Sequence, residues 1–217
     1  MAEHHPGADL LLSYAAGTLG ESWSLAIATH LALCPHCRDL LAVAEELGGT
    51  LLAEVEPIAL APGSWQQVAS RLEGRAETPG PSPAKPTEDV PPTFPQPLRD
   101  FIGSDARDVP WKRIGGGAYQ FLIPTADDAR ARLLLIPAGK PVPRHGHRGR
   151  ELTLVLSGCF SDHIGTFARG DLEDGDEDLV HQPLAGSAAD CICLAVTEAP
   201  LRFTALIPRL VQPFIGI

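Results

Sequence analysis

Histidine and cysteine side chains, which bind transition metals, occur in two groups with regular spacing. The first group is His30-x3-Cys34-x2-Cys37. Residues four apart lie one above the other on a helix, so His30 and Cys34 are expected on the same face. Pro35 is typical of a helix start and places Cys37 in the first turn of a following helix. Two thiolates and an imidazole can therefore converge on one metal ion from a helix–turn–helix corner.

A tetrahedral zinc site requires a fourth ligand, and His5 or His4 near the N-terminus could supply it. His36 lies between the two thiols and is expected to point outward. Two other interpretations stay open at this point. The cysteines could be buried without a metal, or they could form a redox pair, although the βαβ pattern of thioredoxin-like proteins is absent.

The second group follows the pattern Gly-x5-His-x-His-x3-Glu-x6-Gly over residues 139–158. Residues two apart on a strand face the same way, so His145 and His147 should point together into the interior of a barrel. Glu151 can return to the same interior, and His181, which follows an acidic turn at residues 171–178, can complete the site from a neighbouring strand. Three imidazoles and a carboxylate suit Zn, Fe, Ni, Mn or Cu. A solvated histidine-rich loop is the alternative.

Three cysteines lie outside the first group. Cys191 and Cys193 belong to a β-rich run, where residues two apart share one face, and Cys159 follows the last glycine of the second pattern. All three could be buried as small apolar groups. The alternative hypothesis places Cys191 and Cys193 near the second metal, where an oxidant would modify them.

The elements that must position these residues differ between the two parts of the chain. In the first part, apolar residues recur at helical spacing, with capping residues or proline near the starts and glycine near the ends. Gly48 and Gly49 should end the third helix. The expected helices span residues 9–16, 21–33, 35–47 and 64–72.

The second part consists of β-rich runs separated by glycine, proline and aspartate, which is the pattern of a β-sandwich or barrel. Residues 76–97 contain eight prolines, which exclude a helix or an inner strand and predict an extended linker. A rigid loop within one domain is the alternative. The predicted fold class is α plus all-β, with domains 1–75 and 98–217. The expected strands span residues 118–123, 132–136, 151–156, 191–196 and 201–207.

Composition narrows the possible functions. The chain of 217 residues has 27 acidic and 17 basic residues and a net charge of −10, which argues against direct nucleic-acid binding. Nine acids and only three basic residues fall within residues 1–75. No apolar run approaches the roughly 20 residues that cross a bilayer, and no signal peptide is expected. Five cysteines, an odd number, favour metal-bound or redox thiols in a cytoplasmic protein.

The first group also resembles a known family. Its His-x3-Cys-x2-Cys pattern, preceded by Leu-Ser-Tyr-Ala-Ala-Gly-Thr-Leu at residues 12–19, is similar to the zinc-containing anti-sigma domain. The resemblance implies a four-helix module over residues 1–75 with an N-terminal histidine as the fourth zinc ligand, a place that His5 fits better than His4. It also implies capture of an extracytoplasmic-function-type sigma factor, whose surfaces for core RNA polymerase and promoter become covered.

The second group resembles the first motif of the cupin superfamily. The second cupin motif is looser, because Gly170-Asp171 and His181 are recognisable while the usual Pro-x-Gly before the histidine is absent. This resemblance implies a small β-sandwich barrel over residues 98–217. A metal inside it would be held by the three histidines and the glutamate of the second group.

A zinc anti-sigma domain followed by a cupin is similar to the ChrR-type anti-sigma factors. This resemblance implies zinc in both sites and a cupin that is needed for the response to oxidants such as singlet oxygen or organic peroxide. We therefore expect a cytoplasmic regulator, not an enzyme, that binds a sigma factor and contacts neither membrane nor nucleic acid. Its first site should be structural, because four protein ligands leave no open position. The cupin metal could be zinc, iron or manganese.

An enzyme is the main alternative, because three histidines and a glutamate around iron resemble the sites of cupin dioxygenases that act on small molecules. A metal-storage or scaffold protein is a third interpretation. In the regulator, an apolar groove between helices would supply most of the affinity for the partner. The candidates for this groove are Leu10, Leu11, Leu40, Leu41 and Leu47. For each of them, ordinary packing in the protein core is the alternative.

Overall fold

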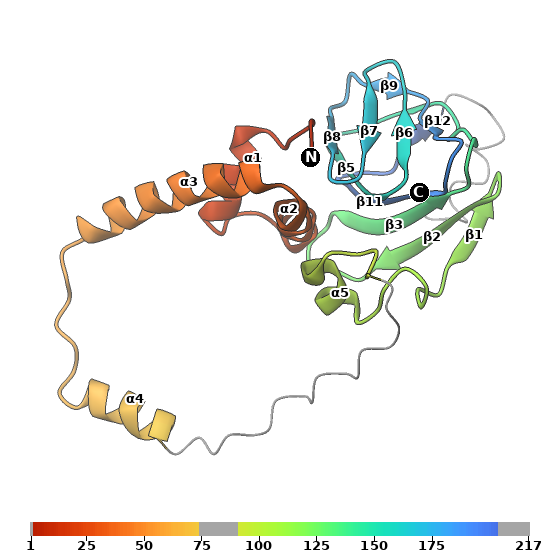
Figure 1. Cartoon of the computed structure of the whole chain (residues 1–217). Coiled ribbons are helices and arrows are strands. Elements are labelled where there is room, and N and C mark those ends of the chain that lie inside the picture. Colours follow the sequence, from red (N-terminus) through yellow and green to blue (C-terminus); the bar gives the residue numbers. More distant parts are fainter. Residues whose placement is uncertain (1, 74–90, 204–217) are drawn as a thin grey trace. The chain divides into compact units, whose positions relative to one another are not determined.

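The computed structural model describes residues 2–73 and 91–203 (Figure 1). Its contacts divide the chain into two compact units, Met1–Gly48 with Pro92–Ile217 and, separately, Gly49–Pro91. The first unit therefore combines the first helices with the β-rich part. The division into domains 1–75 and 98–217 stays a prediction from the sequence. Within the described ranges, no helix has both the length and the apolar character that crossing a membrane requires.

Five helices are described, and the second has the bounds expected from the sequence. Helix α2 is buried on several sides, with Leu25, Ile27 and Leu31 all in the core. This explains why its sequence is apolar nearly all round, as is typical of a helix covered on more than one face. The helices are α1 (Ala8–Ala15), α2 (Glu21–Leu33), α3 (Pro35–Ala53), α4 (Ser64–Glu73) and α5 (Gln96–Ile102).

Helix α3 is longer than the sequence predicts. The expected stop at Gly48 and Gly49 was wrong, because the helix continues to Ala53 and neither glycine has a positive φ. A glycine inside a helix costs only about 1 kcal/mol relative to alanine, which does not by itself end a helix. The following residues favour helix, and the next proline, Pro57, comes four residues after the helix ends.

The end of the proline-rich stretch belongs to the folded unit. Residues 76–90 lie outside the described residues, but Phe94 is buried and α5 already begins at Gln96. The expectation of no helix up to residue 97 was therefore wrong at its last two residues. Pro97 is tolerated there because the first turn of a helix has no internal partner for its backbone N–H.

Among the described residues, twelve strands form three antiparallel sheets, with the orders β1-β2-β3-β11-β5-β8, β10-β6-β7 and β12-β4-β9. The last expected strand, 201–207, is described only as β12, and residues 204–207 lie outside the described residues. The strands are β1 (Lys112–Gly115), β2 (Ala118–Ile123), β3 (Arg130–Ile136), β4 (His145–Gly146), β5 (Glu151–Ser157), β6 (Cys159–Ser161), β7 (Thr166–Ala168), β8 (Leu172–Gly175), β9 (Val180–His181), β10 (Leu184–Ala185), β11 (Cys191–Thr197) and β12 (Arg202–Phe203).

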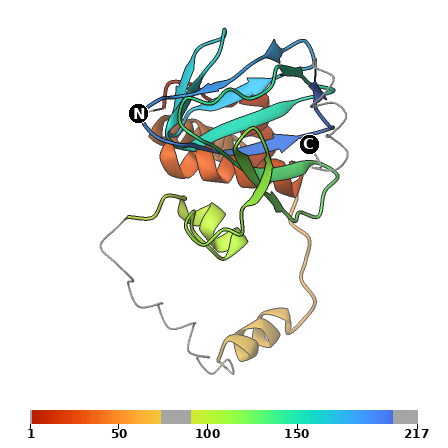
Figure 2. The same ribbon diagram turned by 90° about the vertical axis from the view of Figure 1, so that its right-hand side faces the viewer.

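Both faces of the six-stranded sheet are buried at its centre, along β11. Ile192, Leu194 and Val196 pack into the same core as α2, whereas Cys191 and Cys193 pack into a second core inside the sandwich. Residues that alternate along a strand face opposite sides, so every position of β11 is buried. Helix α2 therefore lies against the outer face of the sheet (Figures 1 and 2).

Candidate metal centres

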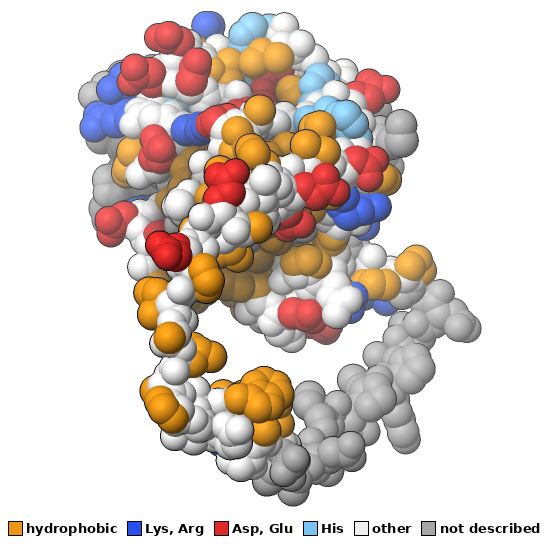
Figure 3. All heavy atoms as spheres, turned by 90° about the vertical axis from the view of Figure 1, so that its left-hand side faces the viewer, with side chains coloured by type: hydrophobic (Ala, Val, Ile, Leu, Met, Phe, Trp, Pro, Cys, Tyr) orange, Lys and Arg blue, Asp and Glu red, His pale blue; other side chains and the backbone are white. Residues whose placement is uncertain are grey.

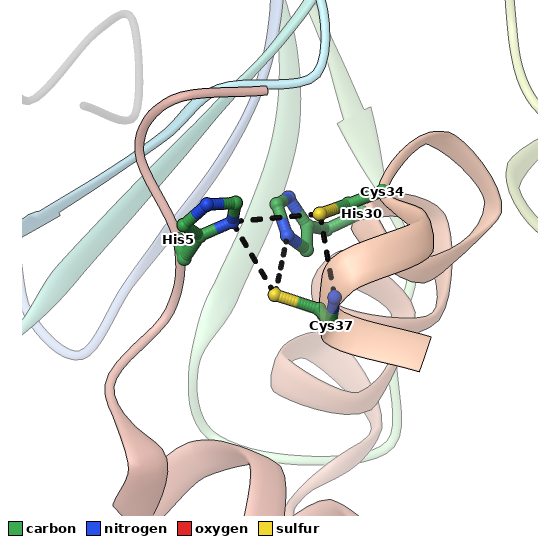
Figure 4. A group of neighbouring side chains, drawn as sticks. All are labelled: His5, His30, Cys34 and Cys37. Atoms are coloured by element: carbon green, nitrogen blue, oxygen red, sulfur yellow. Dashed lines mark hydrogen bonds between the residues drawn. The ribbon is translucent and has the colours of Figure 1, made fainter. Parts of the chain in front are cut away.

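Four potential metal ligands converge where the N-terminal segment meets the corner between α2 and α3 (Figure 4). The Nε2 atom of His30 lies 3.2 Å from Sγ of Cys37, and Nδ1 of His5 lies 3.4 Å from each of the two Sγ atoms. One ligand atom from each residue falls within 4.8 Å of the other three. This set is called the N-terminal cluster below. Its members are His5, His30, Cys34 and Cys37.

The neighbouring histidines take other places. The ring of His4 lies against Phe167, with the ring centroids 4.3 Å apart. His36 is exposed, as expected, although its ring centroid is 5.0 Å from that of His5. Of the two N-terminal histidines that the sequence left open, the structure therefore brings His5 to the cysteines.

Burial shifts the pKa values of two residues of the N-terminal cluster, His30 and Cys37. Burial lowers the pKa of His30 to about 4, although its hydrogen bond to the Gly170 carbonyl opposes this change. The imidazole is therefore neutral near pH 7, which is the form that binds a metal. Burial and the neighbouring Cys34 thiol raise the pKa of Cys37 to about 12, so a cation must displace its proton to bind the thiolate. Two imidazoles and two thiolates match the donors of a closed structural zinc site.

The second convergence lies inside the sandwich. His145 of β4 and His181 of β9 are paired across the strands, and their Nε2 atoms are 3.1 Å apart. The Nδ1–H of His145 donates to the Pro143 carbonyl at 2.9 Å, which leaves Nε2 free to bind a metal. His147 joins them, with the ligand atoms of all three residues within 4.8 Å. Together with Glu151, these histidines are called the cupin centre below.

Glu151 lies beside the three histidines. Its Oε2 is 2.6 Å from Nδ1 of His147. Burial alone would raise the pKa of Glu151, but contact with His147 and the charges of the other histidines hold it below its usual value. Nε2 of His147 is buried without a hydrogen-bond partner among the described residues. Since an unsatisfied buried polar atom is costly, this nitrogen and the three-imidazole set fit a divalent transition metal.

The sequence interpretation missed two carboxylates of this site. Nδ1 of His181 lies 2.8 Å from an oxygen of Asp162 and 3.3 Å from Oε1 of Glu173. Residues 171–178 read as an acidic turn, yet they contain β8, on which Glu173 is buried. The i, i+2 spacing of Asp171, just before β8, and Glu173 was a signal that could have identified Glu173, whereas no comparable pattern marks Asp162.

A cavity of about 70 Å³ adjoins the cupin centre. His145, Glu151 and His181 line it together with Cys191 and Cys193, whose Sγ atoms are 3.6 Å apart. Cys191 and Cys193 are therefore buried, as one interpretation expects, and lie beside the candidate ligands, as the other expects. Their modification by an oxidant stays a prediction. Cys159 is half-buried.

The architecture defines a cupin-type β-sandwich joined to a helical segment with a His/Cys cluster. Residues 100–200 match the model of a family described as the ChrR cupin-like domain. Over 214 residues the chain is 47% identical to the anti-sigma-E factor ChrR of Cereibacter sphaeroides, covering 99% of this chain and 98% of that protein. The chain therefore belongs to the ChrR family of anti-sigma factors.

A solved structure agrees with this assignment. The crystal structure of Rhodobacter sphaeroides SigE in complex with the anti-sigma ChrR is similar with a TM-score of 0.80 and 44% identity. The match covers 91% of this chain and 100% of that chain. Family membership confirms the resemblance, the fold class and the interpretation as a regulatory protein instead of an enzyme.

Proposed function

We propose that this protein is a cytoplasmic anti-sigma factor that captures an extracytoplasmic-function-type sigma factor and releases it when an oxidant acts on the cupin half. Capture is supported by family membership and by the similar complex of SigE with ChrR. The N-terminal cluster would hold zinc as a structural metal. The cupin centre would hold zinc, iron or manganese. The partner is the sigma factor, and we expect no direct binding to a membrane or to nucleic acid.

The observation that carries this proposal is an uncovered apolar stripe on α3. Leu40, Val43, Leu47 and Leu51 follow the spacing i, i+3, i+7 and i+11, which places them along one helix face. Their side chains are between 46% and 66% exposed. A continuous apolar face on a water-exposed helix is typical of a protein-binding surface.

Helix α4 carries a stripe of the same kind. Trp65, Val68 and Leu72 are exposed and spaced by three and four residues. Figure 3 shows apolar side chains exposed on this helix and on the chain before it. The pattern indicates that α4, like α3, forms its apolar contacts with a partner.

The leucines proposed from the sequence divide into two sets. Leu10 and Leu11 are buried in the core, so they were wrong as candidates for a partner groove, and Leu41 is half-buried against that core. Leu40 and Leu47 are exposed and belong to the α3 stripe. Since helical periodicity marks apolar faces without saying which one is covered, the sequence could not separate these sets.

Acidic side chains accompany the α3 stripe. Asp39, Glu45 and Glu46 are exposed on the same helix. A negative surface beside an apolar one speeds encounter with a basic partner and helps to select it, while apolar burial supplies most of the affinity.

Release is proposed to start at the cupin centre or at the cysteine pair beside it. An organic hydroperoxide could oxidise Cys191 and Cys193 to a disulfide. It would take up their two electrons and two protons and be reduced to an alcohol and water. Singlet oxygen could act at the same place. Mass spectrometry after oxidant exposure tests the thiols, because complete release of the partner with unchanged thiols would exclude them from the mechanism.

Co-purification of the full chain with a sigma factor of its own organism tests capture. Leu47→Glu should abolish co-purification without loss of folding, because Leu47 is exposed. Leu184→Arg is the matched control, since Leu184 is also exposed but lies on β10. Equal capture by both variants would contradict the assignment of the α3 stripe.

A further inference from the structure

We propose that the turn between β7 and β8 positions His5 and His30, so that the affinity of the N-terminal cluster for a divalent cation depends on the β-sandwich. This inference rests on the proposed role of the cluster as a metal site. In this proposal, Gly170 and Asp171 hold His30 and His5 in place without binding the metal. Gly170 lies 140 residues after His30 in the sequence but in the same compact unit.

Gly170 fixes the orientation of His30. The buried Nδ1–H of His30 donates to the Gly170 carbonyl at 2.9 Å. A carbonyl only accepts, so the ring proton must lie on Nδ1 and Nε2 must be bare. Nε2 is the atom that faces Cys37. A hydrogen bond from the second ring nitrogen to a carbonyl is the usual way in which proteins orient a metal-binding histidine.

Asp171 holds the segment that carries His5. Its Oδ1 accepts the backbone N–H groups of Glu3 at 2.5 Å and His4 at 3.0 Å. The His4 carbonyl in turn accepts the N–H of Leu172 at 3.2 Å. The residues just before His5 are therefore bound to β8 through their backbone. A chain end without such bonds would have to be ordered by the metal itself, at an entropic cost.

The same segment also contacts the cupin centre. Glu173 lies two residues after Asp171, and its Oε1 is 3.3 Å from Nδ1 of His181. Residues 170–173 thus contact His30 of the N-terminal cluster, the backbone just before His5, and His181 of the cupin centre. A shift of β8 at the cupin centre would change the hydrogen bonds that hold His30 and the segment before His5. The proposed oxidant response could reach the helical part through these hydrogen bonds.

Titration of the full chain with Co²⁺ tests the proposal, because thiolate-to-cobalt charge-transfer absorption reports a site with cysteine ligands. Glu3→Pro removes one backbone N–H that Asp171 accepts, whereas Glu3→Ala keeps it. Glu3 is exposed, so neither change disturbs the core. Asp171→Ala removes the acceptor itself. Its control is Asp105→Ala, since Asp105 accepts two backbone N–H groups, compared with three for Asp171, and neither comes from the N-terminal segment.

The proposal predicts that Glu3→Pro and Asp171→Ala weaken Co²⁺ binding at the thiolate site by about 10- to 100-fold, the usual effect of removing an outer-shell partner. Glu3→Ala and Asp105→Ala should bind like the wild type. Wild-type affinity in Glu3→Pro would overturn the proposal, and this variant decides the question if Asp171→Ala does not fold. Sigma capture by the wild-type chain is measured separately, so its failure contradicts the proposed function while the Co²⁺ result still tests the positioning.

Discussion

His145 of β4 and His181 of β9 lie opposite each other in an antiparallel pair, with their Nε2 atoms 3.1 Å apart. The register of two short strands thus brings together residues that are 36 positions apart in the sequence. The ligand atoms of His145, His147 and His181 lie within 4.8 Å of one another. Removal of either His145 or His181 should therefore abolish metal binding at the cupin centre.

His181→Ala should lower the affinity of the cupin centre for metal at least about 100-fold, since even outer-shell changes cost 10- to 100-fold. Metal analysis of the purified chain should then find one equivalent fewer than in the wild type. His163→Ala is the control, because His163 is exposed and belongs to neither centre. An unchanged metal content in His181→Ala would show that the metal is bound elsewhere.

Leu194→Ala should destabilise the first compact unit by about 2–5 kcal/mol, because Leu194 is fully buried where α2 covers the sheet. Since the helices and the sandwich share this core, circular dichroism and tryptophan fluorescence should report one common shift in urea unfolding. Leu122→Ala, at an exposed position on β2, should change stability by less than about 0.5 kcal/mol. Separate transitions for helices and strands would contradict a shared core.

Gly48→Ala and Gly49→Ala should each stabilise helix α3 by up to about 1 kcal/mol. Neither glycine has a positive φ, and an added Cβ would meet no atom within 4 Å. Far-ultraviolet circular dichroism should therefore show equal or greater helicity in both variants. A loss of helicity would mean that the helix ends at these glycines after all.

Asp9→Asn tests a contact between α1 and the sandwich. Arg150 donates to Asp9 at 2.5 Å and to Asp174 at 2.6 Å. Because Asp9 is largely exposed, the substitution should cost only about 0.2–1 kcal/mol and less at high salt. The hydrogen bond from Arg150 lowers the pKa of Asp9. The contribution of this ion pair to the free energy of unfolding is therefore present above the ordinary pKa of an aspartate. It is lost as the pH falls through the lowered pKa of Asp9.

Urea unfolding of the wild type and Asp9→Asn across the acidic range measures this contribution. The two proteins should differ near neutral pH and become alike at low pH. A difference that grows on acidification would have the wrong sign for an aspartate with a lowered pKa.

The sequence indicated which histidines and cysteines lie close together better than it indicated the residues around them. Helical spacing placed His30 and Cys34 on one face, and the structure brings both to Cys37. The choice of His5 came from family resemblance, because nothing in the spacing of an N-terminal segment distinguishes it from His4. Whether these residues bind a metal stays a prediction.

Long-range packing could not be read from the sequence. Helical spacing of apolar residues predicts a helix over residues 21–33, but it does not say that this helix covers the outer face of the sheet. Residues 171–178 read as a solvated acidic turn, because a strand with buried carboxylates lacks the apolar alternation that identifies strands. For this reason Glu173 was missed, whereas Asp162 lies just after β6, where no pattern in the sequence marks it. The helix end expected at Gly48 and Gly49 was wrong because glycine weakens a helix without necessarily ending it.

Competition with core RNA polymerase tests the proposed function most directly. The full chain, mixed with its sigma factor, should prevent the sigma factor from binding core polymerase, and Leu47→Glu should fail to prevent it. Treatment of the complex with organic hydroperoxide or singlet oxygen should restore polymerase binding. If the wild-type chain left the binding of sigma factor to polymerase unchanged, the protein would not be the sigma-sequestering regulator proposed for it.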